Sequence, residues 1–172
     1  PIYGPFEGAM DRFIKMDKND FIGRDAAAKE QADGSKLKRV SLIVDALDAD
    51  VMGDEPIWAR VNGRDFGTVG KTHDFGAPRF GPDGKEVRGS SAATGASAVR
   101  GLHDGEWAVV DWVTSGGYAH HVGKSMAQGY VPAGLASDES EGFFEIEILG
   151  HRRPARINIE PPFDPSGEKM RG

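Results

Sequence analysis

The chain has 172 residues, no cysteine and a formal net charge of −6, and 38% of its residues are hydrophobic. This length suffices for one domain with a core, but not for two full-sized domains. The acidic balance argues against a nucleic-acid backbone as the main partner, and the absence of cysteine excludes a disulfide framework, a thiolate zinc site and a cysteine nucleophile.

Targeting signals are not visible in the sequence. No apolar stretch reaches the ~20 residues that would span a bilayer, and the amino terminus lacks the basic and apolar regions of a signal peptide. We therefore expect no membrane association and a cytoplasmic location. The chain starts at Pro1 without Met, which is compatible with a fragment, a processed product or a true subunit.

The first third of the chain predicts one helix and up to three strands. Residues 9–16 alternate well enough for a short strand. Asn19 and Asp20 are good helix N-caps, and residues 24–32 are strong helix formers that stop before Asp33 and Gly34. Apolar residues then fall on every second position over 40–46 and again over 57–61, which predicts two strands with one buried side.

Residues 62–105 break this pattern. They are rich in glycine, lack apolar periodicity and contain a low-complexity run at 89–98. Because a structureless loop of this length is rare in a compact domain unless it is functional or inserted, we interpret the segment as an insertion.

The last third predicts more strands. Residues 107–113 and 125–132 have strand character, and residues 144–148 and 155–159 predict a hairpin with basic residues in its connection. About six short antiparallel strands and a single helix indicate a mainly β domain, either a small barrel or a sandwich.

A glycine-rich phrase at residues 114–131 is the strongest candidate for a binding site. Its glycines allow close backbone approach, Ser115 and Tyr118 supply hydroxyls, and Lys124 supplies a positive charge, which together suit an anionic or amide-rich ligand. The alternative, which composition alone favours, is a glycine-rich connection between two strands.

The sequence gives little support for a metal site, a catalytic triad or a nucleotide-binding motif. His120 and His121 are adjacent, so in a strand they would point to opposite faces and could not chelate one metal together. The remaining histidines have no ligand spacing, the basic group at 151–153 is typical of a solvated hairpin end, and no triad, phosphate loop or dinucleotide fingerprint occurs. We predict no metal site.

Two phrases resemble the last domain of the glycine-cleavage T-protein (aminomethyltransferase) family. Residues 18–26, KNDFIGRDA, are similar to its K-x-D-F-I-G-[RK]-E-A opening, and residues 114–131, TSGGYAHHVGKSMAQGYV, to its T-S-G-x-Y-S-P-x-x-G-K-x-I-A-x-G-Y-V stretch. The ending, with Pro161, Pro162 and Phe163, agrees as well. The resemblance covers about residues 5–72 and 106–172, and the wording is most similar to the folate domain of dimethylglycine and sarcosine dehydrogenases and oxidases.

This resemblance implies a small antiparallel, Greek-key-like barrel of about six strands with one short N-terminal helix, spanning residues 21–172 after a tail or linker at 1–20. It implies tetrahydrofolate as cofactor, with FAD elsewhere in the parent protein or complex, and T-protein-type N-terminal domains and a flavoprotein as partners. The family's catalytic aspartate lies in its first domain, which nothing here matches, so no catalytic residue is expected. The implied folate-wall positions are Arg24, Ser115, Tyr118 and Lys124.

The implied function is a part of a one-carbon transfer enzyme that demethylates an N-methyl amine and is not catalytic alone. Two alternatives stay open at this point. One is a stand-alone, non-catalytic barrel that serves as a binding module. The other is a folate-dependent demethylase of a sulfonium or aryl methyl ether.

Overall fold

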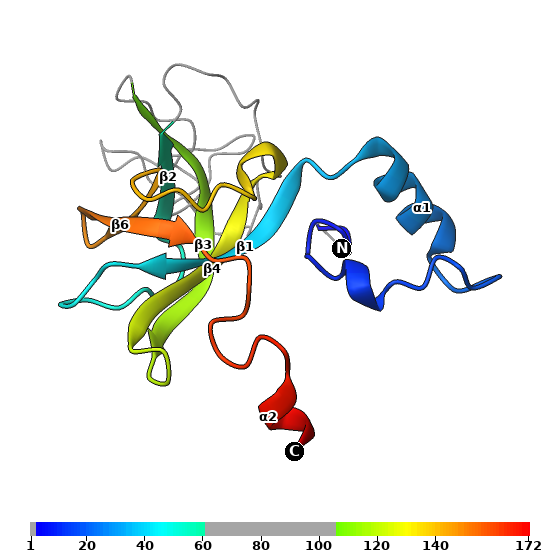
Figure 1. Cartoon of the computed structure of the whole chain (residues 1–172). Coiled ribbons are helices and arrows are strands. Elements are labelled where there is room, and N and C mark those ends of the chain that lie inside the picture. Colours follow the sequence, from blue (N-terminus) through cyan, green and yellow to red (C-terminus); the bar gives the residue numbers. More distant parts are fainter. Residues whose placement is uncertain (1–2, 61–105) are drawn as a thin grey trace, which may run out of the picture.

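Six antiparallel strands close into a barrel in the computed structural model, which describes residues 3–60 and 106–172 (Figure 1). The order around the barrel is β1-β4-β3-β2-β5-β6. The strands are β1 (Leu37–Val44), β2 (Pro56–Arg60), β3 (Trp107–Ala119), β4 (Lys124–Pro132), β5 (Phe144–Ile148) and β6 (His151–Ile157). The predicted mainly β barrel is therefore confirmed, and the predicted insertion at 62–105 lies outside the described residues.

The connectivity is that of a Greek key. Strands β2, β3 and β4 follow one another around the barrel, and β1, which precedes them, lies beside β4 rather than beside β2. The pairing of β1 with β6 then closes the barrel, with Leu42 opposite Ile157 and Val44 opposite Ala155. Closure leaves no free sheet edge along this seam.

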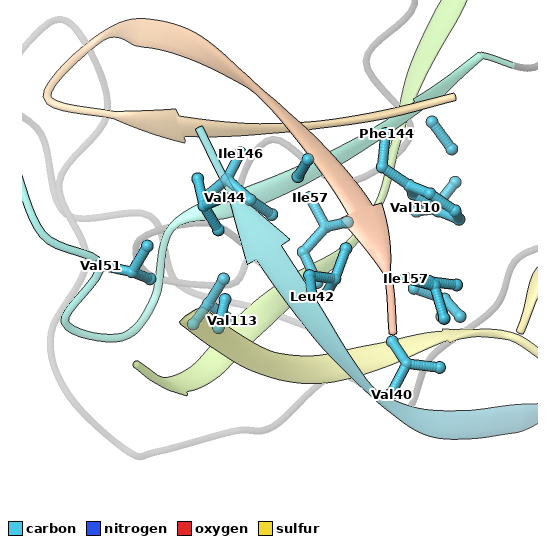
Figure 2. Close-up of a cluster of buried hydrophobic side chains, with 14 of the residues drawn as sticks. Val40, Leu42, Val44, Val51, Ile57, Val110, Val113, Phe144, Ile146 and Ile157 are labelled. Atoms are coloured by element: carbon cyan, nitrogen blue, oxygen red, sulfur yellow. The ribbon is translucent and has the colours of Figure 1, made fainter. Parts of the chain in front are cut away.

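One apolar core fills the barrel (Figure 2). In β1 the side chains of Val40, Leu42 and Val44 are buried, as the alternating sequence predicts, and Ile57 and Ala59 of β2 join them. The other strands contribute Val110, Val113, Phe144, Ile146 and Ile157. Trp58, next to Ile57, is buried as well, although the period of two assigns it to the opposite face.

The N-terminal arm corrects one sequence prediction. Residues 9–16 form turns and the short 3-10 helix η1 (Asp11–Phe13) instead of a strand, because their backbone bonds are local: Phe13 N–H donates to the Met10 carbonyl at 2.9 Å. Segment 3–9 packs against the barrel, where Arg39 N–H donates to the Glu7 carbonyl at 2.7 Å and the rings of Tyr3 and Tyr130 stack at 3.8 Å.

The predicted helix is confirmed as α1 (Arg24–Asp33), which lies beside the barrel in Figure 1. The sequence prediction of the residue that caps its N-terminus is wrong. Gly23 takes that position with φ of 88° and no described side chain caps the helix, so neither Asn19 nor Asp20 does so. Only Ala27 of α1 is buried, so the helix contributes little to the core.

The C-terminal hairpin is tighter than predicted. Ile148 pairs with His151, so the turn consists of Leu149 and Gly150 alone, both with positive φ, at 51° and 80°. This geometry matches the two-residue turns that suit the twist of a hairpin. The basic residues 151–153 therefore lie in β6 and not in the connection, which corrects the prediction of a solvated turn.

A short second helix that the sequence did not predict, α2 (Glu168–Arg171), ends the chain beyond the barrel (Figure 1). It is anchored by Asp164, whose carboxylate accepts from the backbone N–H groups of Lys169 and Met170 at 3.1 and 3.2 Å. Within the described residues, no helix is long and apolar enough to cross a membrane.

Candidate functional site

The glycine-rich phrase forms the long hairpin of β3 and β4. Strand β3 continues to Ala119, beyond the predicted strand end at residue 113, and residues 115–119 pair with β4, for example Ser115 with Gln128 and Tyr118 with Ser125. On its other side β3 pairs with β2 only as far as Trp112. The last part of β3 therefore presents exposed polar groups beside a rigid barrel.

A shallow hollow of about 380 Å³ lies on this hairpin and is lined by residues 115–119 and 126–128. It offers the exposed Ser115 hydroxyl and the Gln128 side-chain amide, whose Oε1 accepts from Arg39 Nη1 at 3.3 Å. Thr114 Oγ1 donates to the Gln128 backbone carbonyl at 3.1 Å. Sequence reasoning missed Gln128 and Arg39, because only the pairing of β1, β3 and β4 brings them to Ser115.

Gly116 serves packing rather than ligand approach. A Cβ on this residue would lie 2.7 Å from Val51 Cβ and 2.9 Å from the Met126 carbonyl oxygen. Val51 belongs to the loop between β1 and β2 and is buried at 1% exposure. Glycine at 116 therefore lets this loop close over β3. At Gly117, by contrast, a Cβ would meet no atom of the described residues within 4 Å, so no packing contact there requires glycine.

Tyr118 lies on the opposite face of β3 from Ser115, because the two positions differ by three along a strand. Its ring is 44% exposed, and its edge contacts His120 with ring centroids 5.0 Å apart. Its hydroxyl points toward the turn, near Gly123. The two hydroxyls that the sequence groups together thus do not converge on one point.

Lys124 opens β4 opposite Ala119 and is exposed. It lines a second hollow of about 450 Å³, together with Arg156, Asp45 and Glu141. The two cations and two carboxylates there form a mixed lining, so the charge of Lys124 is not isolated. This hollow shares no residue with the one beside Ser115.

Arg24 lies apart from the hairpin, at the start of α1. Its guanidinium donates from Nε to the Lys18 carbonyl at 3.3 Å and from Nη2 to the Met16 carbonyl at 3.4 Å. These bonds hold the turn that precedes the helix, which is a structural role. The structure therefore brings Ser115, Tyr118 and Lys124 to one hairpin and leaves Arg24 in the N-terminal arm.

The two histidines of the hairpin turn meet different neighbours. His121 contacts the edge of Phe163 with ring centroids 4.1 Å apart, and His120 contacts Tyr118. Both histidines line a groove of about 500 Å³ between β4, β1 and residues 158–163. Among the described residues no group of three or more metal-ligating side chains comes together.

Tyr130 marks the place where the N-terminal arm covers β4. Burial raises the pKa of its phenol above the usual 10.0, the Arg39 guanidinium lowers it, and the carboxylates of Glu7 and Asp111 raise it. The stack with Tyr3 covers one face of the ring. This surface is therefore occupied by the chain itself.

On the outside of the barrel, Trp58 joins β2 to β5 and β6. Its Nε1 donates to Glu147 Oε2 at 2.8 Å, and the Arg152 guanidinium carbon lies 3.5 Å from its ring centroid. Arg152 also approaches Glu145 at 3.7 Å. These contacts help to bury a tryptophan on the outer face of the barrel, and they give Arg152 of β6 a structural role.

The hairpin offers hydrogen-bonding groups to a polar ligand. The Ser115 hydroxyl and the primary amide of Gln128 can exchange hydrogen bonds with an amide-rich ligand. The hollow is open to one side and no carboxylate lines it, so within the described residues it offers a wall for a ligand and not a complete pocket.

Fold and hairpin together define a closed antiparallel barrel domain with exposed polar groups on one long hairpin. Residues 86–164 match the family model of the glycine cleavage T-protein C-terminal barrel domain. With the relatives described next, this match bears out the resemblance that the sequence shows to the last domain of the glycine cleavage T-protein family.

Relatives include mitochondrial dimethylglycine dehydrogenase of Homo sapiens, 29% identical over 158 residues, which are 91% of this chain and 13% of the human protein. An aminomethyltransferase of Koribacter versatilis is 29% identical over 169 residues, 94% of this chain and 31% of that protein. The chain thus spans less than a third of either relative.

The crystal structure of glycine cleavage system aminomethyltransferase T from Bartonella henselae superposes with a TM-score of 0.56 at 16% identity. The match covers 93% of this chain and 32% of that one. At this identity the likeness supports the fold alone, and it agrees with the closed barrel.

Proposed function

We propose that this chain forms one wall of the tetrahydrofolate site in a one-carbon transfer enzyme that demethylates an N-methyl amine. The observation that carries the proposal is the β3–β4 hairpin. It bears the family phrase and extends past the β2 pairing, with Ser115 and Gln128 exposed on one face. The relatives named dimethylglycine dehydrogenase and aminomethyltransferase support the reaction class.

In this proposal the hairpin binds the folate and fixes its orientation. Ser115 and Gln128 would hydrogen bond amide groups of the folate, and Arg39 keeps the Gln128 amide in place through the 3.3 Å bond to its oxygen. Tyr118, on the opposite face of the hairpin, and Lys124, at its turn end, would meet neighbouring domains or the glutamyl tail. Tetrahydrofolate, when bound, would accept the one-carbon unit, and the described residues would position it along one side.

Arg24 has a narrower proposed role. Its guanidinium already bonds two carbonyl oxygens of the N-terminal arm, so we assign it to bracing the arm beside the folate wall rather than to direct contact. The boundary between a linker at 1–20 and the barrel at 21–172 belongs to the same proposal. FAD and a flavoprotein would be supplied by other parts of the enzyme, in the cytoplasm.

The test begins with native material. An antibody against this 18.5 kDa chain should recover a larger polypeptide, or a complex that contains flavin and folate, as judged by intact mass and absorbance. Recovery of a free monomer of this mass with neither cofactor would overturn the proposal.

Point variants locate the folate wall. In the recovered enzyme, Ser115→Ala and Gln128→Ala should each raise the tetrahydrofolate Kd by roughly fivefold to tenfold, the effect of one hydrogen bond. Ser137→Ala is the matched control, because Ser137 lies outside the hairpin and lines none of its hollow. Equal effects of Ser115→Ala and Ser137→Ala on the tetrahydrofolate Kd would show that the hairpin is not part of the folate site.

A further inference from the structure

One end of the barrel carries another hollow, separate from those beside Ser115 and Lys124, that the proposed folate wall does not use. The loop between β1 and β2 and the Leu149–Gly150 turn of the β5–β6 hairpin line it together, with a volume of about 590 Å³. Both segments project on the left of the barrel in Figure 1. None of its lining residues belongs to the hollow beside Ser115.

Three large apolar side chains stand out at this end. Leu47 is 98% exposed, Met52 83% and Leu149 88%. Leu149 also has φ of 51°, a conformation that glycine or asparagine adopts at lower cost. The turn therefore combines a strained backbone conformation at Leu149 with an apolar side chain that is 88% exposed. Such a combination is typical of a surface that is covered by a partner.

The loop that presents these residues is held in place. Val51 is anchored in the core, as Figure 2 shows. The backbone N–H groups of Met52 and Gly53 both donate to the Glu55 carboxylate at 2.8 Å, and Asp54 N–H donates to the Val113 carbonyl at 2.8 Å. A surface fixed in this way loses little conformational entropy when it binds.

The rim of the hollow is negatively charged. Among the described residues, five carboxylates line it and no lysine or arginine does; they are Asp48, Asp50, Asp54, Glu55 and Glu147. Arg153 pairs with Asp48 at 2.8 Å and offsets one of these charges. Asp50 and Asp54 reach solvent, so the rim keeps an excess of negative charge beside the apolar tips. Charge complementarity then selects a basic partner.

We propose that this end of the barrel docks a partner polypeptide whose surface presents an apolar side chain flanked by lysine or arginine. The apolar side chain enters the space between Met52 and Leu149, and the basic groups meet Asp50 and Asp54. The inference is independent of the folate wall, because the two hollows are lined by different residues.

The experiment is a titration of the ¹⁵N-labelled full chain with a short peptide of alternating lysine and leucine, followed by amide chemical shifts. The shifts should concentrate in residues 47–55 and 147–150. A peptide of alternating glutamate and leucine of equal length should produce none there. A lack of saturable shifts up to about 1 mM peptide, or shifts spread over the whole chain, would overturn the proposal.

Two variants test the apolar contact. Leu149→Asn keeps a side chain that tolerates this φ, so the melting temperature should stay level or rise, while affinity for the lysine–leucine peptide should fall about tenfold. Ile22→Asn is the matched control, because Ile22 is 105% exposed but lies in the N-terminal arm. Equal losses in both variants would refute docking at the barrel end.

A third variant tests the charges. Replacing both Asp50 and Asp54 by asparagine should weaken peptide binding severalfold at low salt and flatten its dependence on ionic strength. Affinity that is unchanged at low salt would exclude the acidic rim as the element that selects the partner.

Discussion

Gly129 of β4 lies where the barrel has no room for a side chain. A Cβ at this position would come 2.6 Å from Ile57 Cδ1 and 2.8 Å from the Trp112 carbonyl oxygen. The Ile57 methyl group could rotate, although Ile57 is fully buried. The Trp112 oxygen cannot retreat easily, because Trp112 pairs with Pro56 of β2. Gly129→Ala should therefore strain the contact between β3 and β4.

The expected cost follows from two opposing effects. Overpacking a close-packed core costs ~1–3 kcal/mol. Alanine recovers ~0.5–1 kcal/mol, because it restricts the unfolded chain more than glycine does. The net loss in the free energy of unfolding should be about 1–2 kcal/mol, which corresponds to a fall in Tm of roughly 2–8 °C for a chain of this size.

Thermal and urea unfolding, followed by circular dichroism, measure this loss. Gly134→Ala is the matched control, since Gly134 lies in the 3-10 helix η3 (Ala133–Leu135), where a Cβ would meet no atom of the described residues within 4 Å. It should be neutral or slightly stabilising. Ile57→Val removes the Cδ1 atom. The double variant with Gly129→Ala should therefore lose less free energy of unfolding than the sum of the two single variants, by ~0.5–1 kcal/mol.

Two results would refute this reasoning. If Gly129→Ala and Gly134→Ala left Tm equally unchanged, the strands would not be packed as closely as the 2.6 Å and 2.8 Å approaches require. If the losses of Gly129→Ala and Ile57→Val were strictly additive, Ile57 would not be the side chain that opposes the new methyl group.

Three further changes address other contacts. Gly116→Ala should cost ~1–3 kcal/mol in urea unfolding, because its Cβ would overlap Val51, and it should shift the amide signals of residues 47–54. Trp58→Phe removes the indole donor to Glu147 and should cost ~1–3 kcal/mol in the same assay; a neutral result would mean that this bond is replaced by water. Tyr130 has a pKa raised above 10.0 in the folded state, so its contribution to stability is complete below pH 10 and is lost as the pH rises through the folded pKa. Melting temperatures at about pH 9 to 11.5 should therefore fall more steeply in the wild type than in Tyr130→Phe, and parallel curves would contradict this.

Local patterns made part of the fold predictable. The period of two in β1 and β5 identified strands whose buried and exposed sides are as expected, and the run of helix formers identified α1. Residues 9–16 show where such patterns fail, because alternation over so few residues does not distinguish a strand from successive turns. The turn of Leu149 and Gly150 was also too unusual to predict, since leucine seldom adopts positive φ.

The candidate site was predictable only as a segment. The phrase at residues 114–131 coincides with the β3–β4 hairpin, but strand pairing decided which of its side chains share a face. Ser115 and Tyr118 lie on opposite faces, and Arg24 lies in the N-terminal arm. Gln128 and Arg39 carried no signal in the sequence, because they lie beside Ser115 only after β4 pairs with both β1 and β3.

By itself, the sequence determined the class of this domain: composition excluded cysteine and thiolate chemistry, periodicity indicated short antiparallel strands, and two phrases indicated the family. Tertiary structure alone decided how the barrel closes, why positions 116 and 129 must be glycine, and which exposed groups share a surface. The physical reason is the range of the interactions. Backbone propensity and alternation act over a few residues, whereas strand pairing and steric exclusion join residues that are far apart in the chain.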